Sequence, residues 1–194
     1  MKLFIAKGYH LAALPVPAKL VYSLFLLFIA VGLWTSWAMY RDRIGANLRG
    51  PPGQPSVEER YVARSLPAAA GGPALELGDD PPPASVPRED LKKPWVMDVF
   101  HQHVFSISVV FLILAHLFML TRLQPWLAGS LILLGGLSAL LHVLAPVLIW
   151  RFGTLFWLMP VSGAAMGFSW TAMVGWTFAT MWFGSAKNLE IKAS

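Results

Sequence analysis

The stretch Phe100–Thr121, F-H-Q-H-V-F-S-I-S-V-V-F-L-I-L-A-H-L-F-M-L-T, decides the class of this protein. It is long and apolar enough to cross a bilayer, whose hydrocarbon core needs about 20 apolar residues per helix. It nevertheless contains His101, His103 and His116. Ionisable side chains are costly inside a membrane, so each of these histidines is a candidate functional residue.

The composition of the whole chain is that of an integral membrane protein. Of its 194 residues 56% are hydrophobic and only 13% are charged, about half the roughly 25% charge of an average soluble domain. The net charge of +5 is scattered without a basic helix face, so no nucleic-acid partner is expected. The chain has no Cys, which excludes disulfides, iron–sulfur clusters, thiolate metal sites and covalently attached c-type haem.

Four apolar runs and one long polar interruption predict an all-α fold, with four transmembrane helices in an up-down bundle. The predicted spans are residues 20–40, 99–121, 126–150 and 154–183. The first run exceeds the roughly 7–15 apolar residues of a signal peptide, so we expect it to be retained. A lead-in (1–19), a long polar loop (41–98) and a tail (184–194) complete the chain.

The polar loop 41–98 is rich in Pro, Gly and Ala and has few residues that could build a core. This composition predicts an extended or disordered segment, with at most one short helix near residues 56–65. The loop is either a solvated linker or a segment that docks a partner protein. Lys and Arg near the span ends favour both termini in the cytoplasm and loop 41–98 outside, as in a bacterial inner membrane protein.

Depth within the bilayer can be counted from the short turn that joins the second and third spans. At a rise of 1.5 Å per residue, His103 lies roughly 26 Å and His142 roughly 24 Å from that turn. These two histidines are therefore predicted at nearly the same depth, towards the outer side. His116 lies only about 6 Å from the turn, where no second imidazole is expected.

The direction of each side chain follows from a turn of about 100° per residue. On a helix, His101 and His103 point about 160° apart, so they cannot bind one metal ion together unless the helix end unwinds. Gly135 and Ala139 share the face of the third span that carries His142, and Gly163 of the fourth span falls near its depth. Small residues there leave room for a planar cofactor, although they are also usual where membrane helices simply pack.

No familiar catalytic pattern is present, and no catalytic residue is predicted. The sequence lacks G-x-S-x-G, H-E-x-x-H, P-loop and Rossmann glycine motifs in a usable context. None of the four predicted spans contains a carboxylate, which excludes carboxylate-based proton pumping inside the membrane. A polar interior of histidines suits haem ligation or a copper or zinc site.

Four spans, histidines at two depths and small residues beside them resemble the four-helix membrane b-type cytochromes. The resemblance implies non-covalent haem b between paired histidines, and electron transfer between a quinone and a partner protein. His103 and His116 have the 13-residue spacing common in that family, but the third span has only His142 and the first and fourth spans have none. A second haem is therefore not expected.

Three functions are left open by the sequence. The first is a redox subunit of the membrane with one haem b between His103 and His142. The second is a non-catalytic anchor or assembly subunit that binds no cofactor and docks partner subunits. The third is a copper or zinc site at the outer face, formed by His101 or His103 together with His142.

Overall fold

The computed structural model describes residues 10–43, 88–121 and 123–184, and all regular structure in these ranges is helical. A short 3-10 helix, η1 (Leu11–Ala13), precedes four long helices: α2 (Val16–Arg43), α4 (Arg88–Met119), α5 (Pro125–Phe152) and α6 (Leu158–Phe183). The short helix expected near residues 56–65 and the tail beyond Gly184 lie outside the described residues.

Three segments in these ranges are long and apolar enough to cross a membrane: Val16–Asp42, Val96–Met119 and Pro125–Phe152. The chain is therefore an integral membrane protein built from helices. Helix α4 begins at Arg88 and not at residue 99, because a charged turn continues the helix beyond its apolar part. Helices α2 and α5 agree with the predicted spans to within a few residues at each end, and α6 is a helix at the position of the fourth predicted span.

The turns between the helices follow from local sequence. Pro125 opens α5 at the first helical position, where its missing N–H would have no partner in the helix anyway. Gly153 ends α5 with a φ of 69°, and its N–H donates to the Ile149 carbonyl at 2.8 Å. Only glycine adopts that backbone conformation readily, so the chain can reverse here into α6.

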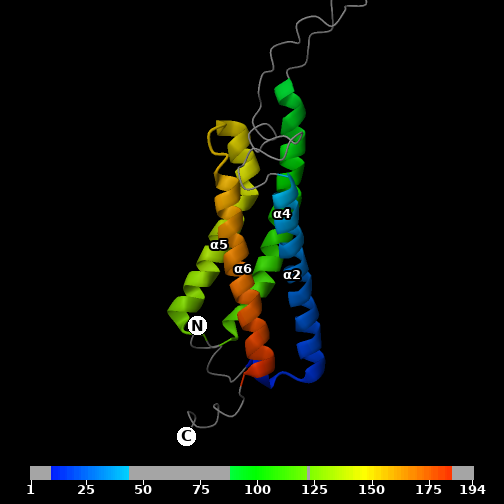
Figure 1. Cartoon of the computed structure of the whole chain (residues 1–194), viewed down its shortest axis with the longest axis vertical. Coiled ribbons are helices and arrows are strands. Elements are labelled where there is room, and N and C mark those ends of the chain that lie inside the picture. Colours follow the sequence, from blue (N-terminus) through cyan, green and yellow to red (C-terminus); the bar gives the residue numbers. More distant parts are fainter. Residues whose placement is uncertain (1–9, 44–87, 122, 185–194) are drawn as a thin grey trace, which may run out of the picture.

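The helices alternate in direction, with α2 and α5 running one way and α4 and α6 the other (Figure 1). Helix α6 is central, because it contacts η1, α2, α4 and α5. Helix α4 also packs on α5, whereas α2 and α4 hardly touch each other in the described residues. We call the end where α2 finishes and α4 begins the loop end of the bundle.

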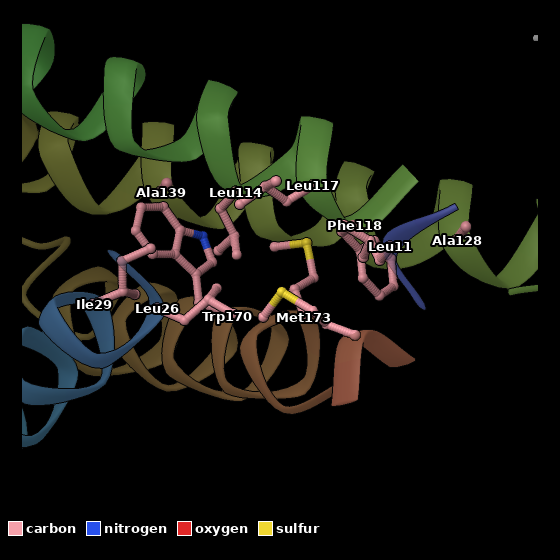
Figure 2. Close-up of a cluster of buried hydrophobic side chains, with 11 residues drawn as sticks. Leu11, Leu26, Ile29, Leu114, Leu117, Phe118, Ala128, Ala139, Trp170 and Met173 are labelled. Atoms are coloured by element: carbon pink, nitrogen blue, oxygen red, sulfur yellow. The ribbon is translucent and has the colours of Figure 1, made fainter. Parts of the chain in front are cut away.

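Buried apolar side chains form two separate clusters. The large cluster is centred on Trp170 and Met173 of α6, which lie between α2 on one side and α4 on the other (Figure 2). The small cluster lies at the loop end and joins Val96 of α4 to Ala145 and Ile149 of α5. The gap between these two clusters holds the candidate site.

Candidate functional site: a polar layer between two apolar clusters

Each of three helices carries a polar side chain where it passes from one cluster to the other. On α5, His142 lies between Ala139 of the large cluster and Ala145 of the small cluster. On α6, Ser162 lies between Met159 and Met166, which pack against the small and the large cluster respectively. His103 occupies the matching position of α4. We call His103, His142 and Ser162 the polar layer.

His142 is held by a hydrogen bond that joins α5 to α6. Its Nδ1 lies 3.1 Å from the hydroxyl oxygen of Ser162, which is 3% exposed. The Ser162 hydroxyl donates its only hydrogen to the Leu158 carbonyl at 2.6 Å. With the hydroxyl hydrogen directed to Leu158, Nδ1 of His142 is the donor to Ser162. The lone pair of the imidazole is therefore on Nε2.

His103 has its Nδ1 anchored within its own helix. This nitrogen lies 2.8 Å from the Val99 carbonyl oxygen, which can only accept, so Nδ1 of His103 carries the hydrogen. The lone pair is again on Nε2. His103 and His142 lie near enough for electrostatic interaction, which places the two rings in one region of the bundle.

His103 belongs to the inner stripe of α4 although its side chain is exposed. The stripe continues at intervals of three or four residues through Ile107, Val110, Leu114 and Leu117, all of which belong to the large cluster or pack against it. The exposure of His103 follows from the sparse contact between α2 and α4, which leaves this level of the stripe uncovered. The polar layer therefore has an open side.

The two other histidines of α4 lie outside the layer. His101 is exposed and packs edge-on against the Phe105 ring, with the ring centroids 5.2 Å apart. His116 is exposed on the same outer side of α4, near Leu112 and Ile113 in the helical register. The structure brings neither His101 nor His116 to His142.

The small residues expected to leave a slot are in contact with other side chains. A Cβ at Gly163 would lie 3.1 Å from Cε1 of His142, so the imidazole itself takes the room that this glycine provides. A Cβ at Gly135 would meet the Cε methyl of Met173 at 3.0 Å. Ala139 is buried in the large cluster. Gly135 and Gly163 therefore serve close packing between α5 and α6.

Ser162 was not singled out from the sequence, although it provides the partner of His142. Its neighbour Gly163 was placed correctly near the depth of His142, and the same depth count would have pointed to Ser162. The described residues contain no group of three or more His, Asp or Glu side chains that could hold a metal ion. The donor set of the layer is two imidazoles.

Comparison with known proteins gives the class of the domain. Residues 78–188, more than half of the chain, match the family model Aq_1264_TM, a transmembrane helical domain. No curated protein and no solved structure matches the chain. The matched residues include all of α4, α5 and α6, and hence the whole polar layer, but not α2. The chain therefore belongs to the Aq_1264_TM family of transmembrane helical domains.

Proposed function

We propose that this protein is a membrane-embedded redox subunit in which His103 and His142 hold one b-type haem. One observation carries the proposal: both rings give their Nδ1 hydrogen to an oxygen of the protein and keep the Nε2 lone pair. Histidines that bind metals usually have this arrangement, because the second hydrogen bond fixes the tautomer and the ring orientation. A haem held there would supply one-electron transfer.

The donor set fits a haem, and the open side of the layer gives it a place to enter. His103 is exposed, and α2 and α4 hardly touch in the described residues. Ser162 and the Val99 carbonyl would orient the two axial imidazoles. The close contact of Gly163 with His142 limits the room on the α6 side of the layer.

We further propose that α6 is the fourth membrane span. Its 26 residues correspond to about 39 Å of helix, enough to cross the hydrocarbon core. It runs antiparallel to α5 in the bundle. With both termini in the cytoplasm and loop 41–98 outside, the polar layer lies in the outer half of a bacterial inner membrane. A quinone and a partner subunit are then the electron partners.

A second candidate is a non-catalytic anchor or assembly subunit. It is favoured by the close packing at Gly135 and Gly163, where side chains fill the room expected for a cofactor. In that case the hydrogen bond from His142 to Ser162 only joins α5 to α6. A copper or zinc site is less well supported, since His101 lies on the outer side of α4 and leaves only two imidazoles.

A visible spectrum of the purified protein decides between these functions. The redox proposal predicts a Soret band and a sharp α band on reduction, both lost in His142→Ala and in His103→Ala. His116→Ala is the matched control and should keep the full haem content. A colourless protein, or unchanged haem in His142→Ala, would refute the haem assignment. Stoichiometric copper or zinc in a colourless protein would instead support the metal site.

A further inference from the structure

A narrow cavity lies between α4 and α5, about one helical turn along from the polar layer, and Ile107 and Ala139 are part of its lining. Its volume is about 160 Å³, and its walls include Val104, Ser108 and Phe111 of α4 with Gly136, Leu140 and Val143 of α5. Ser108 and Leu140 are exposed, so the cavity is a groove that opens to the surroundings of the bundle. We propose that this groove binds one acyl chain of a membrane phospholipid.

The depth of the groove indicates which ligand it can meet. Residues 104–111 form the middle of the span Val96–Met119, and residues 136–143 form the middle of Pro125–Phe152. At the middle of a bilayer the surroundings are hydrocarbon chains, with no head group or water. The groove is therefore open to acyl chains and closed to polar ligands.

The chemistry of the walls agrees with a hydrocarbon ligand. Ser108 is the one wall residue with a polar side chain, and its hydroxyl donates to the Phe105 carbonyl of its own helix at 2.9 Å. The groove thus offers no free donor to the carbonyl groups of a quinone ring. Its volume is close to the about 150 Å³ of an engineered apolar cavity that stays dry and binds benzene, so a short length of chain fits.

The Phe111 ring forms the floor of the groove and is held in place by its neighbours, so the groove can keep its shape without a ligand. The Phe111 ring stacks on Trp170 with 5.9 Å between the ring centroids. Trp170 in turn donates its Nε1 hydrogen to the Gly135 carbonyl at 3.3 Å. Gly136 lets the Phe111 ring approach α5 closely, because a Cβ there would lie 3.0 Å from Cζ of that ring.

The test uses the full chain in vesicles that contain a phospholipid with a photoreactive diazirine near the end of one acyl chain. After irradiation, mass spectrometry of the peptides locates the cross-links. We expect them to concentrate in residues 104–111 and 136–143. Ser108→Phe fills the groove and should lower the yield in these segments to that of the other lipid-exposed residues.

Ser130→Phe is the matched control, because Ser130 is also an exposed serine bonded to its own helix, through the Trp126 carbonyl at 2.9 Å. It should leave the yield unchanged. If Ser108→Phe does not fold, Leu140→Trp replaces it, with the exposed Leu133→Trp as its control.

Cross-links spread evenly over the exposed faces of α2, α4, α5 and α6, or an unchanged yield in the filled variant, would overturn the proposal. A yield that falls on adding a polyprenyl quinone, but not on adding unlabelled phospholipid, would assign the groove to isoprenoid chains and would also overturn it. Neither result depends on whether the protein binds haem.

Discussion

The imidazole of His142 and the hydroxyl of Ser162 form a hydrogen bond of 3.1 Å between the neighbouring helices α5 and α6. Ser162 is fully satisfied, because it also donates to the Leu158 carbonyl at 2.6 Å. The bond lies between the two apolar clusters, where Gly163 of α6 also packs closely on the His142 ring. It therefore fixes the orientation of His142 and adds a polar contact to the packing of these two helices.

Removal of the Ser162 hydroxyl should weaken the bundle modestly. Hydrogen bonds between membrane helices contribute about 0.6 kcal/mol on average and at most about 1.7 kcal/mol, so Ser162→Ala should lower the free energy of unfolding within that range. Titration with a denaturing detergent, followed by circular dichroism, measures this change. Ser130→Ala removes an exposed hydroxyl bonded within its own helix and should have no measurable effect. Equal effects of the two variants would contradict a special role for Ser162.

Two glycines of α6 should respond differently to the same substitution. A Cβ at Gly163 would lie 3.1 Å from Cε1 of His142, whereas a Cβ at Gly167 would meet nothing within 4 Å. Gly→Ala without a clash stabilises a helix interior by roughly 0.5–1 kcal/mol. We expect Gly167→Ala to leave the free energy of unfolding unchanged or to raise it. The free energy of unfolding of Gly163→Ala should be about 1–2 kcal/mol lower than that of Gly167→Ala, because the His142 ring must move. Detergent unfolding of both variants measures the difference.

The depth of the two key histidines could be estimated from the sequence, and their partners could not. A constant rise per residue placed His103 and His142 near one level, and in the structure the two lie near enough for electrostatic interaction. The count could not show that α6 is central, since hydropathy identifies spans but not which spans are neighbours. Ser162 was missed for this reason, and the slot expected at Gly163 is taken by the His142 ring.

The helix boundaries show a similar limit. The apolar pattern located the membrane part of α4 well, because transfer into hydrocarbon depends on side-chain polarity. It could not predict the start at Arg88, since a helix continues into water as long as its backbone hydrogen bonds are made. Helical geometry alone predicted that His101 and His103 point in different directions. The exposed His101 packs on Phe105, four residues further along the same side of the helix.

The contact between α4 and α5 can be tested at another pair of glycines. A Cβ at Gly136 would lie 3.0 Å from Cζ and 3.1 Å from Cε1 of Phe111, while Gly129 on the same helix has nothing within 4 Å. The Phe111 ring stacks on Trp170 and cannot move without disturbing it. We therefore expect Gly136→Ala to be about 1–3 kcal/mol less stable than Gly129→Ala in detergent unfolding. Equal stability of the two variants would mean that the Phe111 ring can move away from a Cβ at position 136 without a cost in stability.

Helix α2 lies outside the matched family domain, so its attachment to α6 is a separate question. The Trp182 indole donates to the Ser23 hydroxyl at 2.9 Å, and Lys19 lies 5.7 Å from the centre of the Trp182 ring. Trp182→Phe keeps an aromatic face for Lys19 but removes the hydrogen bond, which should loosen this end of α2 by about 0.5–1.5 kcal/mol.

Because the chain has no Cys, spin labels can be attached to cysteines introduced on α2 and α6 alone. The exposed Val21 and Phe178 are suitable positions for the labels. The distribution of distances between them should broaden in Trp182→Phe and stay narrow in Trp176→Phe, which alters a half-exposed tryptophan of the same helix. An unchanged distribution in Trp182→Phe would mean that the packing of Leu26 and Ile29 beside Trp170 is enough to hold α2 in place.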